Sequence, residues 1–248
     1  MEYNRIIHGD CLEVMKTFDD NSFDVIVTSP PYNLGKPSRS KTVNTGRVRV
    51  GIYERHYDVY SDDMPDEEYI LWQRECLEEM LRLIPDTGAI FYNHKSRIID
   101  GVYKNLADDI VKGFPLRQLI IWKKSGGHAF HNTFFLPTYE LIYLICKKDF
   151  KLNKNYVVGD VWEIHQTQNK IFPDHPASFP TDLPHNALSA CVGATRVLDP
   201  FSGSGTTCYV AQQLGMQWIG IDKSLMYCDT SREIIQSAGL ARQSETLF

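Results

Sequence analysis

The four consecutive residues Ser29-Pro30-Pro31-Tyr32 are of types that could hold a planar amine. The two prolines fix the backbone dihedral φ and bring no N–H groups of their own, so the turn is rigid and its carbonyls stay available as acceptors. The Ser29 hydroxyl and the Pro30 carbonyl can each accept a hydrogen bond from an amine, and the Tyr32 ring can stack on a flat ring. A Pro-Pro turn that merely ends a strand is the structural alternative.

A glycine-containing turn near the C-terminus forms a second candidate site between a strand-like run and a helix-like segment. Its residues are Asp199, Pro200, Phe201, Ser202, Gly203, Ser204, Gly205 and Thr206. Open α/β sheets bind ligands at such turns, and glycine lets the backbone approach a ligand closely. A further strand-like run ends at Asp222, next to Lys223, where an acid can hold a ribose diol. A tight strand-to-helix connection without a ligand is the alternative.

The residue types around this turn favour a cationic adenosine derivative over other nucleotides. The dinucleotide fingerprint needs a third glycine where this chain has Cys208, and the phosphate-binding sequence Gly-x-x-x-x-Gly-Lys does not occur. NAD, FAD and nucleoside triphosphates therefore lose support. The Asp199 carboxylate would repel a pyrophosphate, whereas it suits the positive sulfonium of S-adenosylmethionine.

Taken together, the two motifs resemble those of the N6-adenine and N4-cytosine amino-methyltransferases of DNA. That family pairs Asp/Asn/Ser-Pro-Pro-Tyr/Phe with Phe-x-Gly-x-Gly, and here the tetrapeptide comes first, as in the circularly permuted β class. The resemblance implies a catalytic role for Ser29, Pro30, Pro31 and Tyr32, with a flipped base of double-stranded DNA stacked on Tyr32. It also implies cofactor-binding residues, namely Asp10, His175, Ala177, Phe179, Asp199, Phe201, Ser202, Gly203, Gly205, Thr206, Asp222 and Lys223.

Within that set, the resemblance assigns Asp10 to the adenine of the cofactor and Asp222 to its ribose. It likens the segment from His175 to Phe179 to one that closes over S-adenosylmethionine, while a Pro-rich surface turn is the alternative there.

The sequence favours direct methyl transfer to an exocyclic amine. No cysteine follows a proline in this chain, so the nucleophile of the cytosine-C5 enzymes is missing. A leading Ser29 is commoner among N4-cytosine enzymes, whereas Asn33 and the following 34–36 resemble the adenine enzymes, and we favour adenine N6. An RNA or protein amine methyltransferase and a catalytically dead DNA-binding regulator are the alternatives.

Two basic segments are candidate DNA-contact loops, although the formal net charge of -5 excludes a uniformly basic protein. Segment 36–57 contributes Lys36, Arg39, Lys41, Arg47, Arg49 and Arg55, and segment 123–135 contributes Lys123, Lys124, His128 and His131. Phosphate contacts from these loops would position the DNA. A solvated loop is the alternative for the first. Segment 147–174 is the candidate target-recognition segment and is short for a recognition domain. Recognition is therefore either shared with the two basic loops or completed by a second subunit of a homodimer.

The elements that must position these residues are strand-like apolar runs that alternate with amphipathic segments. The runs lie at 24–28, 89–93, 118–122, 140–146, 196–199 and 217–222, and the helical segments at 65–84, 206–214 and 225–236. Strands that are apolar on both sides belong to buried, mainly parallel sheets. We therefore expect a doubly wound, mostly parallel, Rossmann-like α/β sheet with helices on both faces, in one domain over residues 1–248.

Composition excludes several other classes of protein. Hydrophobic residues make up 43% of the chain, enough for a sizeable core, and no run approaches the roughly 18 apolar residues of a membrane span. The N-terminus lacks the basic and apolar regions of a signal peptide, so we expect a cytoplasmic protein without membrane contact. Six cysteines without a C-x-x-C pair indicate neither a disulfide framework nor a metal site.

Overall fold

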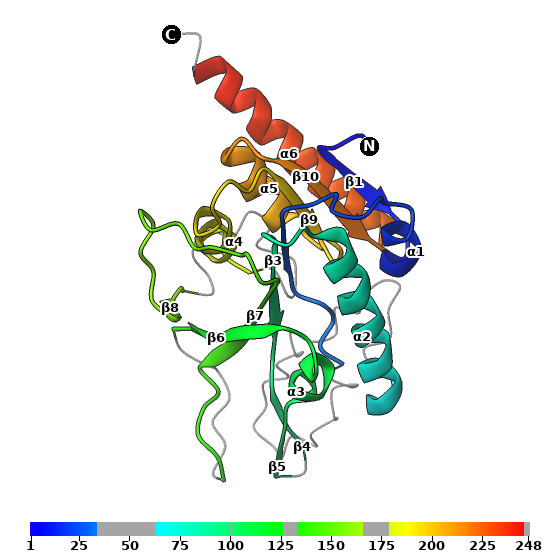
Figure 1. Ribbon diagram of the computed structural model, residues 1–248, viewed down its shortest axis with the longest axis vertical. Coiled ribbons are helices and arrows are strands. Elements are labelled where there is room, and N and C mark those ends of the chain that lie inside the picture. The colour runs from blue at the N-terminus through cyan, green and yellow to red at the C-terminus, as the bar shows by residue number, and fades with distance from the viewer. Residues whose placement is uncertain (34–62, 100, 126–132, 166–178, 246–248) are drawn as a thin grey trace, which may run out of the picture.

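The computed structural model describes residues 1–33, 63–99, 101–125, 133–165 and 179–245 and centres on one eight-stranded sheet (Figure 1). The strand order is β1-β10-β9-β2-β3-β7-β6-β8, and β7 runs antiparallel to both neighbours while the other strands share one direction. The strands are β1 (Arg5–His8), β2 (Val25–Thr28), β3 (Ala89–His94), β6 (Leu116–Lys123), β7 (Tyr139–Cys146), β8 (Val161–Glu163), β9 (Arg196–Asp199) and β10 (Gln217–Asp222). The mostly parallel sheet is thus confirmed.

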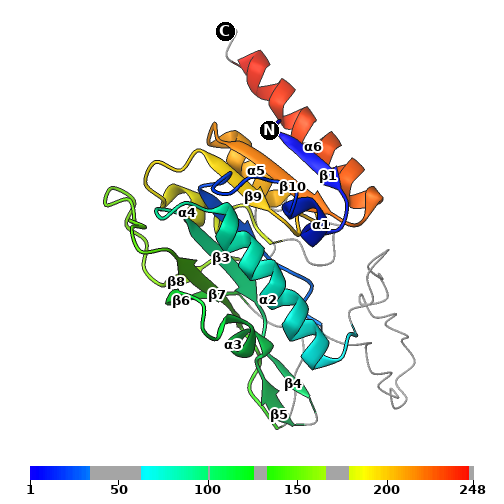
Figure 2. The same cartoon turned by 45° about the vertical axis from the view of Figure 1, so that its right-hand side comes forward.

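Helices cover both faces of this sheet, as the sequence predicts. One face packs against α1 (Cys11–Met15), α2 (Asp66–Leu83) and α3 (Leu106–Val111), and the other against α4 (Asp182–Ser189), α5 (Thr206–Gln213) and α6 (Leu225–Glu245). Figure 2 shows α2 lying across its face of the sheet. Alternation along β2 explains the two cores, because Val25 and Val27 enter one hydrophobic cluster and Ile26 enters the other. A separate hairpin joins β4 (Arg97–Ile99) to β5 (Val102–Lys104).

The direction in which the chain winds changes between β9 and β2. After β9 the chain passes through α5 to β10 on one side, and after β2 it passes through α2 to β3 on the other. Open α/β sheets bind ligands beyond the carboxyl ends of the strands at such a switch point. Both candidate motifs follow these two strands directly, because Ser29 comes after β2 and Pro200 comes after β9.

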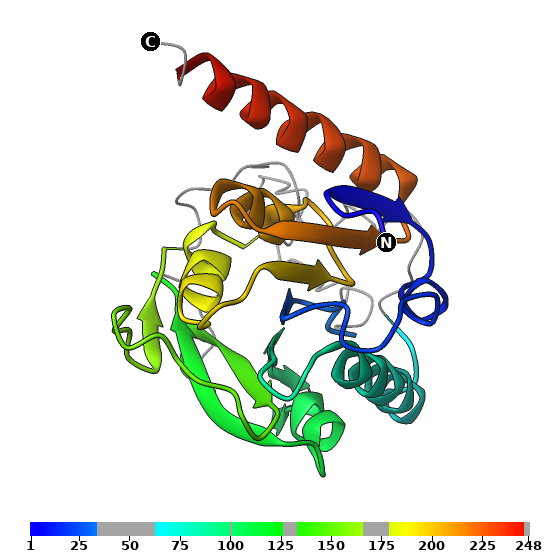
Figure 3. The same ribbon diagram turned by 45° about the horizontal axis from the view of Figure 1, so that its top comes forward.

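The N-terminal strand completes the C-terminal half of the sheet. Ile6 of β1 pairs with Gly220 of β10, and His8 pairs with Asp222, in parallel register. Figure 3 shows α6 running alongside β1, so the two ends of the chain share one side of the sheet. Asp10, two residues beyond β1, is thereby brought to the same sheet edge as Asp222.

Short elements and the far edge of the sheet differ from expectation. Sequence periodicity missed β1, α1, β4, β5, α3, β8 and α4, and α6 extends beyond the predicted segment 225–236. The outer residues of β6 are not buried, since Leu119 is 44% and Ile121 is 38% exposed. None of the helices in the described ranges is both long enough and apolar enough to cross a membrane.

Candidate active site

The glycine turn after β9 is held in shape by Asp222. Its two carboxylate oxygens accept hydrogen bonds from the backbone N–H groups of Gly203 and Ser224, each at 2.8 Å. Gly205 adopts a φ of 74°, and a Cβ there would lie 2.9 Å from the Cβ of Ser231 on α6. The turn therefore needs glycine at this position for both its backbone conformation and its close packing.

Asp199 connects the glycine turn to the strand that carries the tetrapeptide. The carboxylate is buried, and its Oδ1 accepts hydrogen bonds from Thr28 Oγ1 at 2.7 Å and from the Phe201 N–H at 3.1 Å. Burial raises the pKa of Asp199 to about 6, and the nearby charge of Asp222 acts in the same direction. A positive ligand at this edge would stabilise the ionised carboxylate.

Further polar groups gather at the carboxyl ends of β1, β10 and β9. Asp10 accepts a hydrogen bond from the Leu12 N–H at 3.1 Å at the start of α1, and its Oδ2 lies 3.6 Å from the Lys223 ammonium. The buried Ser202 hydroxyl has no hydrogen-bond partner among the residues that the structure describes. Carboxylates, glycine backbone and an unsatisfied hydroxyl fit the cationic adenosine cofactor that the sequence predicts.

The remaining cofactor candidates lie in two environments. Thr206 is the first residue of α5, and its Oγ1 lies 3.0 Å from the Ser204 hydroxyl. The Phe201 ring meets Trp72 of α2 edge-on, with 5.8 Å between the ring centres. Phe179 is buried shortly before α4 in the hydrophobic cluster of that face. His175 and Ala177 fall outside the described residues.

The tetrapeptide is built into a partly buried hydrogen-bond network. The Ser29 hydroxyl lies 2.6 Å from the Tyr32 hydroxyl, and Asn93 Nδ2 donates to Tyr32 at 2.5 Å. Tyr32 and Asn93 both donate to Glu140 Oε2, at 3.2 and 3.1 Å. Glu140 Oε1 in turn accepts from the Lys124 ammonium at 2.6 Å. Residues from β3 and β7, together with the residue that follows β6, therefore fix the side chains of the motif.

A second set of contacts fixes the backbone of the same turn. The Tyr69 hydroxyl of α2 donates to the Pro31 carbonyl at 2.7 Å and lies 2.9 Å from His94 Nε2. The ring centres of His94 and Tyr32 are 5.1 Å apart, and burial lowers the pKa of His94 to about 4. His94 is therefore neutral at physiological pH. Asn33 closes the turn with a φ of 54° and donates to the Met64 carbonyl at 2.7 Å.

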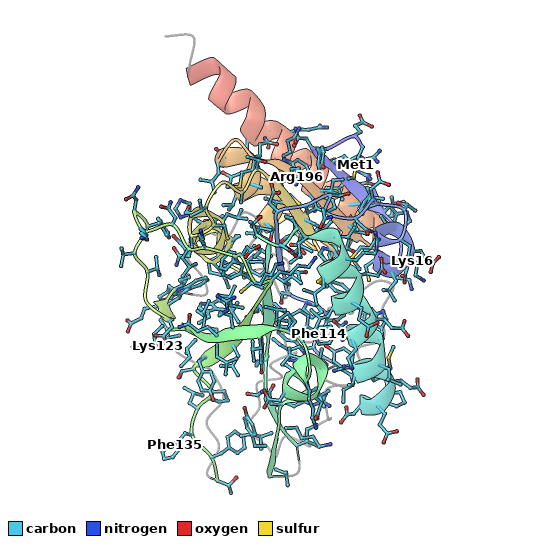
Figure 4. All side chains as sticks on the ribbon, viewed as in Figure 1. Met1, Lys16, Phe114, Lys123, Phe135 and Arg196 are labelled. Carbon is cyan, nitrogen blue, oxygen red and sulfur yellow. The ribbon has the colours of Figure 1, made fainter. Side chains whose placement is uncertain are left out.

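The structure places Lys123 and Lys124 in different environments. The Lys123 side chain is 54% exposed and pairs with Glu163 at 2.8 Å. The Lys124 side chain is only 10% exposed and pairs with Glu140 at 2.6 Å, so Lys124 adjoins the hydrogen-bond network of the tetrapeptide and its role in DNA contact stays a prediction. In the same segment Phe135 is 97% exposed, and it projects at the lower left of Figure 4.

The other DNA-contact candidates lie outside the described residues. They are Lys36, Arg39, Lys41, Arg47, Arg49, Arg55, His128 and His131. Of segment 147–174, the described part includes β8, whose Trp162 stacks on Phe91 at 6.3 Å between ring centres. Across the described ranges, no group of three or more His, Cys, Asp or Glu side chains could hold a metal ion.

Sequence reasoning missed the residues that hold the tetrapeptide. Glu140 carried a signal, because it is the one charged residue in the apolar run 140–146 and is nevertheless buried. Asn93 and His94 end the apolar run of β3 and are buried as well. Polar residues inside buried strands need partners, and those partners come from distant parts of the chain.

Comparisons with known proteins agree with the geometry. Residues 23–233 match the family model of the N6 and N4 DNA methylases. The type II methyltransferase M.BglII from Bacillus subtilis is 28% identical over 94% of this chain and 69% of its own length. The type II methyltransferase M.HpaI from Haemophilus parainfluenzae is 27% identical over 94% of this chain and 74% of its own.

Solved structures share the fold. The cytosine-N4-specific PvuII DNA methyltransferase has a TM-score of 0.75 at 17% identity, covering 94% of this chain and 86% of its own. A putative DNA modification methylase from Thermus thermophilus, complexed with S-adenosyl-L-methionine, has a TM-score of 0.63 at 22% identity, covering 94% of both chains. With the family model matching most of its length, the chain belongs to the N6 and N4 DNA methylase family.

Proposed function

We propose that this chain is a site-specific DNA methyltransferase that transfers a methyl group from S-adenosylmethionine directly to the exocyclic amine of a flipped base. The observation that carries the proposal is the 2.7 Å hydrogen bond from Thr28 to Asp199. Thr28 immediately precedes the tetrapeptide, and Asp199 begins the glycine turn. The bond therefore holds the amine-binding motif and the cofactor motif side by side at the switch point of the sheet.

In this proposal the tetrapeptide makes a poor nucleophile reactive. The lone pair of an exocyclic amine is conjugated with its ring. Accepting its two protons at the Ser29 hydroxyl and the Pro30 carbonyl favours a more tetrahedral nitrogen whose lone pair is free to react. S-adenosylmethionine supplies the electrophilic methyl group. Tyr32 offers a ring face on which the extruded base can stack.

The proposed target atom is adenine N6. Asn33 supports this assignment, because its left-handed conformation and its bond to the Met64 carbonyl shape the turn directly after Tyr32, in the part of the motif that resembles adenine enzymes. Cytosine N4 is the alternative, supported by Ser29 at the head of the motif. Mass spectrometry of nucleosides from methylated DNA separates the two.

The proposed DNA interface combines phosphate contacts with an exposed aromatic ring. Within the described residues, Lys123 supplies a partly exposed cation, and Phe135 supplies a ring that nothing in its surroundings buries. Segment 36–57 follows the tetrapeptide along the chain, and we propose that its six Lys and Arg side chains contact phosphates as well. Phosphate contacts position the duplex, and segment 147–174 is proposed to read the sequence.

A homodimer is a further part of the proposal. Leu119, Ile121 and Val161 are each more than a third exposed, and Ile121 pairs directly with Val161 across β6 and β8. Apolar side chains that adjoin on a sheet face are typical of protein contacts. Sedimentation of the wild type and of Ile121→Lys tests this part. A dimer that Ile121→Lys converts to monomer supports it, and a wild-type monomer at micromolar concentration contradicts it.

The activity itself is tested with S-adenosylmethionine carrying a tritiated methyl group. We expect label to enter unmethylated DNA from several genomes and not to enter RNA or protein incubated in parallel. Ser29→Ala should abolish labelling of DNA while cofactor affinity, measured by calorimetry, stays at the wild-type value. Label only in RNA or protein would contradict the DNA substrate, and wild-type labelling by Ser29→Ala would remove the tetrapeptide from the mechanism.

A further inference from the structure

A buried ion pair adjoins the tetrapeptide in a place where packing alone does not explain it. The side chains of Lys124 and Glu140 are 10% and 9% exposed, and their charged atoms are 2.6 Å apart. Desolvating two charges costs several kcal/mol per ion, so well-packed apolar residues are often as stabilising as a buried ion pair. Lys124 also lies over the Trp122 ring, 5.5 Å from its centre. We therefore look for a functional role of the ion pair between Lys124 and Glu140.

Glu140 is the acceptor in each of its three side-chain hydrogen bonds that the structure shows. An ionised carboxylate can only accept, and Lys124, Asn93 and Tyr32 all donate to it. Burial alone would raise the pKa of Glu140, but the charge and hydrogen bond of Lys124 hold it below its ordinary value. Glu140 is therefore ionised at neutral pH and stays an acceptor.

An ionised Glu140 favours one orientation of the Ser29 hydroxyl. The Tyr32 hydroxyl has one proton, which it donates to Glu140. The Tyr32 oxygen also accepts from Asn93 Nδ2 at 2.5 Å. Either hydroxyl could donate in the 2.6 Å contact between Ser29 and Tyr32, and with the Tyr32 proton given to Glu140 we assign Ser29 as the donor. Of the two lone pairs of the Ser29 oxygen, one faces Asn93 Nδ2 at 3.4 Å, and the other is left for another donor. An amine N–H of the target base is such a donor.

We propose that Glu140, held by Lys124, is a positioning residue that sets the direction of the Ser29–Tyr32 hydrogen bond and so keeps Ser29 an acceptor for the target amine. This inference rests on the proposed function of the tetrapeptide. It gives Tyr32 a second role beyond stacking, because the Tyr32 hydroxyl transmits the effect of the carboxylate to Ser29. Lys124 acts indirectly, by keeping Glu140 charged.

The first test removes the charge of Glu140 and keeps its shape. In Glu140→Gln the side-chain amide can donate to Tyr32, which then donates to Ser29 and occupies its lone pair. With DNA and cofactor saturating, the single-turnover rate constant should fall roughly 100-fold, the scale of a misplaced reacting group. Cofactor affinity should not change. Glu140→Asp, which keeps the charge, should recover to within about tenfold of the wild type.

Two more variants separate this role from folding and stacking. Tyr32→Phe keeps the ring but removes the hydroxyl, so we expect a similar loss of rate, whereas a stacking role alone predicts the wild-type rate. Lys124→Gln combined with Glu140→Gln leaves no unpaired buried charge. This double variant should fold and remain slow, whereas a purely structural ion pair predicts that the rate returns.

The matched control is Asp24→Asn, which breaks a partly buried ion pair at the amino ends of the central strands β2 and β9. Asp24 precedes β2 and bonds Arg196 of β9 at 2.6 Å. We expect lower thermal stability and an unchanged rate constant. Wild-type rates in both Glu140→Gln and Tyr32→Phe, or restoration in the double variant, would overturn the inference while leaving the proposed function intact. A wild-type protein without DNA methylation would instead overturn the proposed function.

Discussion

Replacing Asp199 with Asn should change stability and cofactor affinity in opposite directions. Asn keeps an oxygen that can accept from Thr28 and from the Phe201 N–H, so the hydrogen bonds of Oδ1 survive. What disappears is the negative charge, whose burial raises the pKa of Asp199 to about 6 from an ordinary value of 3.8. This one substitution therefore separates the effect of the buried charge on folding stability from its effect on cofactor affinity.

The stability effect follows from linkage. An acid whose pKa is higher in the folded chain stabilises folding below the unfolded pKa, and this contribution is lost as pH rises through the folded value. For pKa values near 6 and 3.8 the loss is at most about 3 kcal/mol above pH 6. Asp199→Asn should thus unfold at a higher urea concentration than wild type at pH 8 and at a similar one near pH 4. Asp24→Asn should unfold at a lower urea concentration than wild type at pH 8. Burial acts to raise the pKa of Asp24, but hydrogen bonds from Arg196 and Thr195 and the charge of Arg196 outweigh it and lower the pKa.

The affinity effect has the opposite sign. Losing one charged interaction costs about 1.5–3 kcal/mol, so S-adenosylmethionine should bind Asp199→Asn roughly 10- to 150-fold more weakly at pH 8. In the wild type, affinity should rise as pH passes through about 6, where Asp199 ionises, and this rise should be absent in the variant. Calorimetry between pH 5 and 8, run alongside urea unfolding, measures both effects. Equal stability and equal affinity at every pH would refute the role given to this carboxylate.

Three further predictions concern the glycine turn and the DNA. Gly205→Ala should lower the free energy of unfolding by urea by about 2–5 kcal/mol, because the added Cβ clashes with Ser231 and φ is strained. The control Gly215→Ala has a φ of 73° but open space around it, so it should lower this free energy by only about 1 kcal/mol. Asp222→Ala should weaken cofactor binding in calorimetry by about 1.5–3 kcal/mol and leave DNA affinity unchanged, since the backbone of the turn loses its acceptor. Replacing Arg47, Arg49 and Arg55 together should make the plot of log affinity against log salt less steep, by about 0.9 for each phosphate that is no longer neutralised. An unchanged slope would exclude segment 36–57 from DNA binding.

Strands and motifs with a strong local pattern could be predicted from sequence. The runs that became β9 and β10 match the predicted bounds, and β2 and β3 differ from theirs by one residue. Parallel strands buried on both faces are apolar throughout, so their signal does not depend on their neighbours. The tetrapeptide and the glycine turn were equally visible, because prolines and glycines mark backbone geometry directly.

Features that depend on pairing across the chain could not be predicted in this way. The antiparallel direction of β7 is not visible in its apolar run, because direction is set by the strands beside it. The sequence places Lys124 in a basic loop, and its burial against Glu140, on a strand that is distant in the sequence, is visible only in the structure. The short elements β1 and α1 contain too few residues for a periodic pattern to emerge.

In the proposed reaction the tetrapeptide directs methyl transfer to an exocyclic amine of DNA. Its most direct test is mass spectrometry of nucleosides from unmethylated DNA incubated with S-adenosylmethionine and either the wild type or Ser29→Ala. We predict N6-methyladenine with the wild type and no methylated nucleoside with Ser29→Ala, at equal cofactor affinity. N4-methylcytosine would change the target base alone. Methylation at a ring carbon, or equal product from Ser29→Ala, would contradict direct methyl transfer by the tetrapeptide.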